Sequence, residues 1–370
     1  AVVVGGGTPD TNTSQYWNGK IQWFTPSEIG RNKYVYNSVR TISEEGLNKS
    51  SAKLLPIGTI LLSSRATVGE CSINKKECTT NQGFQSLIPK ENISNEFVYY
   101  LIQTKRKDLI RKSCGSTFLE ISANEVRKIV VSIPTIKEQD KIAKLLSLLD
   151  ERIATQNKII DKLQTLIKGI MASCQNSGLK NNTWGKISLC DVLTERKELN
   201  KQLHPVFSVS VSQGVINQIE YLGRSFAAKD TSKYNVVHYG DIIYTKSPTG
   251  DFPYGIVKQN YNQEEVAVSP LYGVYAPKTY SIGVFLHEYF KSNVNTYNYL
   301  HPLIQKGAKN TINITNQHFL ENKVAMPFND DELESISKLL LSLNAKVVLM
   351  QHIKGNYEQQ KQYLLRQMFI

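Results

Sequence analysis

The sequence has no long apolar run and few cysteines. Across its 370 residues, no stretch reaches the ~18 consecutive apolar residues that a membrane-spanning helix needs. The apolar start AVVVGGG is too short for the core of a signal peptide, and because it begins so abruptly we expect further residues ahead of it. None of the five cysteines forms a C-x-x-C pair, a pattern typical of reduced thiols in a cytoplasm. The six scattered histidines argue against a zinc site.

The usual motifs of catalysis are missing as well. An amino-methyltransferase needs Asn or Asp before Pro-Pro-Tyr or Pro-Pro-Phe, and no such tetrapeptide is found. Gly5–Gly7 has no helical pattern behind it, so we interpret it as a turn. Asp191–Lys197 (DVLTERK) has the letters of a magnesium nuclease site, but its two acids lie only four positions apart, which favours an amphipathic helix or turn. No Walker-type GK[ST] loop occurs. The sequence therefore predicts a chain without catalytic residues.

Acidic residues are outnumbered by basic ones. Forty-four Lys and Arg against 32 Asp and Glu give a formal charge of +12 and a pI near 9.2. Clustered cations gain free energy when they release the counterions of a polyanion, so the charge favours a nucleic-acid partner. A basic protein without such a partner remains open from charge alone.

Two stretches half a chain apart repeat one pattern. Ile121–Pro134 and Ile314–Pro327 both begin with Ile and a hydroxyl residue, carry Val ten places on, and end with Pro. We interpret each as the last strand of a repeated unit before a long helix. Ahead of them, three more pairs recur in the same order, which indicates a duplication. These pairs are a Gly turn with a strand (Pro56–Arg65, His238–Ser247), an amphipathic helix (Asn95–Thr104, Ile282–Ser292) and a polar tip with a strand (Cys114–Ser122, Gly307–Thr315).

A long helix is predicted after each copy. Behind Pro134, apolar residues recur every 3.5 positions for about four heptads, which is the signature of a coiled coil. We expect the two helices to pair in antiparallel fashion, although each could instead pack only on its own globular unit. Gln156 is the single polar position in the first seam and is suited to setting register. The predicted seam residues are Ile142, Leu146, Leu149, Ile153, Gln156, Ile160, Leu163, Ile167, Ile336, Leu340, Leu343, Val347, Met350 and Tyr357.

The predicted fold class is α+β. Short strands mixed with isolated helices favour mostly antiparallel, curved sheets rather than a doubly wound parallel sheet. We expect a duplicated, pseudo-two-fold architecture with recognition domains at 1–135 and 176–328 and helices at 136–175 and 329–370. Such a chain could hold two surfaces at a fixed separation along a DNA duplex.

Four motifs carry a family resemblance. They are Trp17–Gly30 after GGGTP, Gly58–Glu70, Asn81–Pro89 and Ile133–Ile153. Together they resemble the specificity subunit of type I restriction-modification enzymes, over essentially the whole chain. The resemblance implies a non-catalytic subunit of the bacterial or archaeal cytoplasm that reads a bipartite, asymmetric DNA target. It also implies docking of two adenine methyltransferase subunits, which bind S-adenosylmethionine, and of restriction-translocase subunits, for host modification and phage defence. The second half departs from the family: it reads NDDELESI where the first helix has KEQ.

Candidate DNA contacts follow from residue chemistry. Lys and Arg suit phosphates, whereas Arg, Lys, Asn, Gln, Ser and Thr suit base edges. Arg65 could equally form an internal ion pair, Ser116 and Thr117 could be a plain turn, and packing is the favoured role of Tyr254. The candidates are Arg31, Lys33, Arg65, Lys75, Ser116 and Thr117 in the first copy, and Lys246, Ser247, Thr249, Tyr254, Lys309, Asn310 and Thr311 in the second.

Two other functions remain open from the sequence. A coiled-coil scaffold without a role on nucleic acid would explain the helices but not the duplicated basic units. A fragment of a fused enzyme, with its catalytic half elsewhere, would explain the missing motifs. Salt-dependent binding to DNA distinguishes the first of these from a DNA reader.

Overall fold

The computed structural model describes residues 1–115, 119–224, 226–306 and 312–369. The chain forms two compact units. Unit 1 comprises Ala1–Asn157 and His352–Ile370, and unit 2 comprises Lys158–Gln351.

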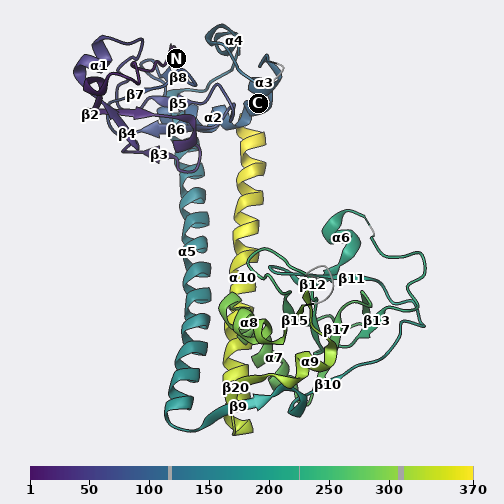
Figure 1. Cartoon of the computed structure of the whole chain (residues 1–370). Coiled ribbons are helices and arrows are strands. Elements are labelled where there is room, and N and C mark those ends of the chain that lie inside the picture. The colour runs from purple at the N-terminus through teal and green to yellow at the C-terminus, as the bar shows by residue number, and fades with distance from the viewer. Residues whose placement is uncertain (116–118, 225, 307–311, 370) are drawn as a thin grey trace. The chain divides into compact units, whose positions relative to one another are not determined.

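Unit 1 contains two sheets (Figure 1). The larger has the order β1-β8-β5-β6-β3, antiparallel except for the parallel pair β3 and β6. The smaller has the order β4-β2-β7, with β7 parallel to β2. The elements are β1 (Val2–Gly5), β2 (Trp17–Phe24), β3 (Tyr34–Val35), β4 (Arg40–Ile42), α1 (Glu44–Asn48), β5 (Ile60–Leu62), β6 (Cys71–Asn74), β7 (Cys78–Thr80), β8 (Gln85–Ile88), α2 (Asn95–Thr104), α3 (Arg106–Arg111) and α4 (Ala123–Arg127).

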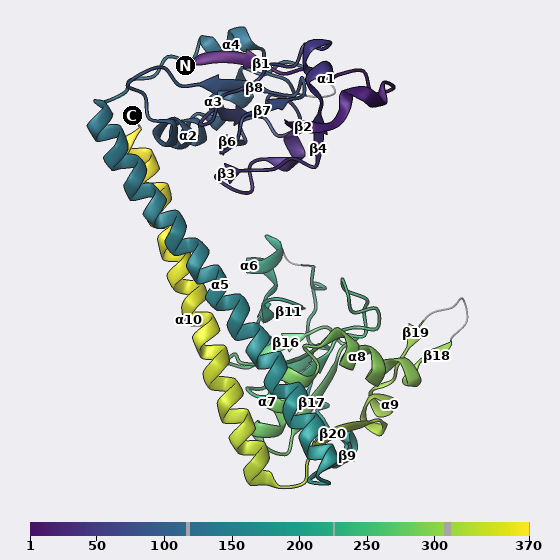
Figure 2. The same cartoon turned by 90° about the vertical axis from the view of Figure 1, so that its left-hand side faces the viewer.

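Unit 2 has a four-stranded antiparallel sheet of order β10-β17-β14-β15 and four two-stranded ladders. Figure 2 shows the pair β18 and β19 beside α8 and α9. The elements are β9 (Trp184–Ser188), β10 (Leu193–Glu195), β11 (Phe207–Ser210), β12 (Gly214–Asn217), α6 (Gln218–Leu222), β13 (Asn235–Val237), β14 (Ile242–Tyr244), β15 (Val257–Gln259), β16 (Val266–Val268), β17 (Gly273–Pro277), α7 (Tyr280–Tyr289), α8 (Asn293–Leu300), β18 (Gln305–Lys306), β19 (Ile312–Asn313), α9 (Asn316–Glu321) and β20 (Lys323–Pro327).

The strand order confirms the duplication. The order β1-β8-β5-β6 of unit 1 recurs as β10-β17-β14-β15 in unit 2. The Gly turn before the third strand of each sheet has a left-handed backbone, with φ of 86° at Gly58 and 89° at Gly240. A buried asparagine closes both turns in the same way. Asn74 Nδ2 donates to the carbonyl of Pro56 at 2.9 Å, and Asn260 Nδ2 donates to the carbonyl of His238 at 3.0 Å. The fold class is thus α+β with mostly antiparallel pairing, as predicted.

Two long helices complete the fold. The first, α5 (Ile136–Lys180), begins where the sequence predicts and ends five residues beyond the predicted limit. The second is α10 (Asp330–Met368). Every predicted seam residue is buried or half-buried, whereas most positions between them are exposed. Side chains of both helices enter the main hydrophobic cluster of each unit, so the helices pack on the domains as well as on each other.

The core of unit 1 lies between its sheet, α2 and the two helices. On α2, Phe97 and Tyr100 are fully buried, and Phe97 stacks on Phe369 at the end of α10 with ring centroids 4.9 Å apart. Leu146 of α5 and Leu365 of α10 belong to the same cluster. Burial of one such side chain contributes roughly 1.5–3 kcal/mol, so the helix ends form part of the folded domain.

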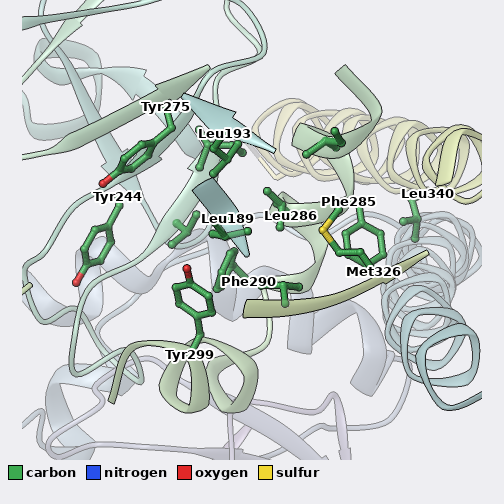
Figure 3. Close-up of a cluster of buried hydrophobic side chains, with 14 of the residues drawn as sticks. Leu189, Leu193, Tyr244, Tyr275, Phe285, Leu286, Phe290, Tyr299, Met326 and Leu340 are labelled. Carbon is green, nitrogen blue, oxygen red and sulfur yellow. The ribbon is translucent and has the colours of Figure 1, made fainter. Parts of the chain in front are cut away.

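The core of unit 2 is aromatic (Figure 3). Phe319 of α9 stacks on Tyr244 and Tyr275, with centroid distances of 4.7 and 4.8 Å. Phe285 of α7 packs edge-on against Trp184 of β9 at 5.6 Å. Leu340 of α10 is fully buried in this cluster. The strands, α7, α9 and the long helices therefore share one core.

The predicted last strand of the first copy is wrong. Ser122 and Thr315 both cap a short helix with their side-chain oxygens, so each repeated stretch starts as α4 or α9. The second copy then continues as β20, which pairs with β9 over its whole length. Residues 128–134 of the first copy form no strand, because no described strand of unit 1 takes the place of β9. Ile133 is consequently 43% exposed, while the equivalent Met326 of β20 is buried.

Candidate nucleic-acid interface

Each unit has a hairpin loop between two of its duplicated strands, on the side opposite the Gly turn. In unit 1 the loop joins β5 to β6, and the amide of Ser63 donates to the carbonyl of Glu70 at 2.9 Å. In unit 2 it joins β14 to β15, and the amide of Thr245 donates to the carbonyl of Ile256 at 3.1 Å. The same bond thus closes the base of both loops, whose enclosed residues differ in number and type. A rigid base with a variable tip suits recognition.

A second loop lies against the first in unit 1. Cys114 and Glu120 exchange backbone hydrogen bonds at 2.9 Å, and the amide of Ile121 donates to the carbonyl of Ser64 at 3.0 Å. The predicted contacts Ser116 and Thr117 fall between these residues and lie outside the described ranges. In unit 2 the pair β18 and β19 occupies the corresponding place in the chain. The predicted Lys309, Asn310 and Thr311 also lie outside the described ranges.

Arg65 forms the internal ion pair that the sequence left open, and its contact with DNA stays a prediction. Its Nε lies 2.8 Å from Glu120 Oε1, which joins the two loops, and its side chain remains 45% exposed. An exposed ion pair of this kind contributes only ~0–1 kcal/mol. The pair therefore positions the guanidinium between the loops. Because it is weak, the guanidinium can exchange Glu120 for another anion at little cost in free energy.

Lys33, another predicted DNA contact, makes internal contacts. Its ammonium lies 3.0 Å from Glu96 Oε2 and donates to Ser147 Oγ of α5 at 3.2 Å, and its side chain is only 11% exposed. It joins the domain to the long helix. Arg31 and Lys75 remain exposed, and the ammonium of Lys75 lies 4.1 Å from the ring centroid of Tyr34.

In unit 2 the predicted loop residues gather on one hairpin. Ser247 and Thr249 are exposed, and Thr249 pairs with Phe252 within the loop. Lys246 is half-buried in a left-handed conformation with φ of 61°. Burial lowers the pKa of Lys246, and the nearby Glu195 carboxylate opposes this shift. Transfer next to a phosphate would favour the charged form.

Tyr254 packs, as the sequence favoured. Its ring centroid lies 5.4 Å from that of Tyr297 on α8 and 5.9 Å from that of His301, and the rings of Tyr297 and His301 stack at 5.0 Å. The three rings connect α8 to the base of the hairpin loop. Tyr297 is 42% exposed and was not among the sequence candidates.

Sequence reasoning also missed α3. The run KRKDLIRK, residues 105–112, contains five basic residues and one acid. Leu109 is fully buried and anchors the helix, while Arg106, Lys107 and Arg111 are exposed. Arg106 lies against the first loop, with Nη2 3.4 Å from Glu70 Oε1. The charge run itself was the available signal.

Three further observations concern metal binding, thiols and membrane helices. No three His, Cys, Asp or Glu side chains within the described ranges group so as to hold a metal ion. Cys71 and Cys78 are free and buried, and burial raises the pKa of both thiols to about 12, which makes them poor nucleophiles. No helix in the described part of the chain is both long and apolar enough to cross a membrane.

Comparison with known proteins finds similarity in the first half of the chain. Residues 1–165 match the model of the family described as type I restriction modification DNA specificity domain. Residues 1–165 are thus similar to a type I restriction-modification specificity domain. A stretch of 168 residues is 40% identical to the type I restriction enzyme MjaIX specificity subunit of Methanocaldococcus jannaschii. Another of 153 residues is 32% identical to the EcoR124I/EcoR124II specificity subunit of Escherichia coli.

The sequence matches cover under half of each chain. They span 44% and 40% of this chain, and 39% and 38% of the two relatives. The fold likeness is wider. The type I restriction-modification S subunit of M. genitalium superposes with a TM-score of 0.59 at 14% identity, over 98% of this chain and 99% of that one. At this identity the match shows a shared fold, and it extends that fold through the second unit.

Proposed function

We propose that this chain is the DNA-reading subunit of a type I restriction-modification complex. Each unit reads one half of a bipartite, asymmetric target through its pair of loops. The single observation that carries the proposal is the duplicated hairpin, with its base held by the same bonds in both units and its tip differing between them. Two hairpins with the same base and different tips suit the recognition of two different half-sites.

The helices provide the second part of the proposal. Side chains of α5 and α10 enter the core of both units, so each long helix contributes to the folding of both proposed readers. We assign to them the spacing of the two half-sites and the docking of two adenine methyltransferase subunits. S-adenosylmethionine and the catalytic residues belong to those partners, and the restriction subunits join through the complex. This assembly acts in the cytoplasm.

The test is methylation mapping. The chain is co-expressed with its cognate methyltransferase subunit in a host without other adenine methylation, and methylated adenines are mapped across the genome. We expect one asymmetric target with two specified blocks and an unspecified gap. A contiguous target would contradict the two-reader arrangement, and methylation without this chain would contradict its role in specificity.

Loop exchange sharpens the test. Replacing the residues between Thr245 and Ile256 with another sequence of equal length should alter one half of the target and leave the other half unchanged. Replacing the loop between Ser63 and Glu70 should alter the opposite half. A scaffold without a role on DNA predicts no change of target in either case.

A further inference from the structure

Helices α3 and α8 occupy the same place in the two units but differ in charge. Each follows the amphipathic helix, α2 or α7, and each precedes the second loop, α8 with the short 3-10 helix His301–Leu303 in between. Each also contacts the base of the hairpin loop. A Cβ on Gly69 would lie 2.7 Å from Cγ of Arg106, and Tyr297 packs on Tyr254, next to Gly255. The pair is thus a further element of the duplication.

The exposed face of α3 is cationic. Arg106, Lys107 and Arg111 are exposed, and the side chain of Arg111 is 78% exposed. Arg111 pairs with Asp108 on the same helix at 2.7 Å, and Lys107 makes no ion pair among the described residues. Such exposed pairs contribute little and yield readily to a phosphate. The face therefore retains its attraction for a polyanion.

The matching face of α8 carries no charge. None of Asn293–Leu300 is ionisable as Lys, Arg, Asp or Glu. Val294, Tyr297 and Asn298 are its exposed residues around the middle of the helix. Aromatic and amide groups can contact sugar, bases or phosphate oxygens without releasing counterions.

We propose that α3 is the phosphate-binding helix of unit 1, and that α8 contacts DNA in unit 2 without neutralising phosphates. The inference rests on the proposed DNA-reading function and adds a division of labour. Unit 1 supplies much of the salt-dependent, sequence-independent affinity, and α8 supplies contacts that do not depend on salt. Each phosphate neutralised on B-DNA contributes about 0.9 to the slope of log affinity against log salt.

The test uses three variants of the full chain. In the first, Arg106→Gln, Lys107→Gln and Arg111→Gln remove three exposed charges of α3. In the matched control, Lys137→Gln, Lys141→Gln and Lys144→Gln remove three exposed charges of α5, so both variants have the same net charge. In the third, Val294→Lys and Asn298→Lys add two charges to α8. Circular dichroism checks that all three keep the fold.

Affinity for a random-sequence duplex is measured between 50 and 200 mM salt. For the α3 variant we expect the slope to fall by about 2.7, so that the affinity ratio across this salt range drops about 40-fold. The control should keep the slope of the unaltered chain, and the α8 variant should steepen it by up to about 1.8. Methylation mapping should give the same target for the α3 variant, because phosphate contacts do not specify sequence.

The outcomes separate the two proposals. If the unaltered chain does not bind duplex DNA, the DNA-reading function itself fails. If it binds and the α3 variant keeps its slope, or the control loses as much slope, only the assignment of α3 is overturned. An unchanged slope after the lysines are added to α8 would show that α8 does not face DNA.

Discussion

Asp150 of α5 should hold the two long helices to the domain of unit 1. Its carboxylate accepts from Lys361 of α10 at 2.6 Å and from the hydroxyl of Tyr100 on α2, also at 2.6 Å. The side chains of Lys361 and Asp150 are 16% and 30% exposed. Burial, followed by the hydrogen bond to Asp150, raises the pKa of Tyr100 above its ordinary range. One carboxylate therefore joins three helices.

The cost of its removal can be estimated from these bonds. A hydrogen bond to a charged group contributes roughly 1.5–3 kcal/mol, and a half-buried ammonium without its partner adds a penalty. We expect Asp150→Ala to destabilise unit 1 by about 3 kcal/mol, and Asp150→Asn, which can still accept from Tyr100, by about 1–2 kcal/mol. In a double-mutant cycle with Lys361→Met, the coupling energy should be about 1–2 kcal/mol.

The assay follows urea unfolding by tryptophan fluorescence. Trp17 and Trp23 lie in unit 1 and Trp184 lies in unit 2, so a shared Trp184→Phe background reports on unit 1. Arg111→Met, which breaks the exposed pair of Arg111 with Asp108 in unit 1, is the control and should cost under about 0.5 kcal/mol. A cost below about 1 kcal/mol for Asp150→Ala, or a coupling energy near zero, would refute this reasoning.

Two further predictions concern a buried lysine and the missing last strand of the first copy. Burial, with repulsion from Lys291 second, lowers the pKa of Lys258 from 10.5 to about 8. Stability should therefore rise between about pH 8 and 10, where the unfolded chain binds more protons. Lys258→Met should remove that rise in thermal unfolding and stabilise the chain at pH 7 by up to about 3 kcal/mol; a rise retained in the variant would contradict it. Separately, a copy of Trp184–Asp191 fused ahead of Ala1 would supply unit 1 with a strand equivalent to β9. Residues 129–133 should then form a strand whose amides are protected from hydrogen exchange. The same fusion with Asp in place of its Ile187 is the control and should give no such protection.

The sequence predicted the long helices and the Gly turns, because both depend on residues close together in the chain. The seven-residue apolar repeat gave α5 and α10 to within a few residues, since each buried position needs only its neighbours at i+3 and i+4. The Gly turns at Gly58 and Gly240 were equally readable, because their positive φ favours glycine. In both cases the physical cause lies within a few residues of the chain.

The failures share a long-range cause. Residues 121–134 have the same pattern as 314–327, yet only the latter ends in a strand, because β9 pairs with it from 135 or more residues away. Lys33 is held by Glu96 and Ser147, neither of which its own surroundings in sequence reveal. The basic run of α3 was visible, but its place beside the loop depends on the contact of Arg106 with Glu70.

The hairpin is closed by bonds that do not involve its tip, which explains how the same fold can serve two different recognition domains. The bonds that fix the hairpin use the amide of Asn74 or Asn260, the glycine before the strand and the first and last backbone pairs of the loop. None of these bonds involves a side chain at the tip. Exposed tip residues such as Ser247 and Thr249, and the exposed faces of α3 and α8, can therefore change without disturbing the fold, and a change in target need not cost stability. Substitutions should accordingly separate into two sets. Asn74→Ala should lower the free energy of unfolding, whereas exchange of an exposed tip residue such as Thr249 should alter the target and leave unfolding unchanged.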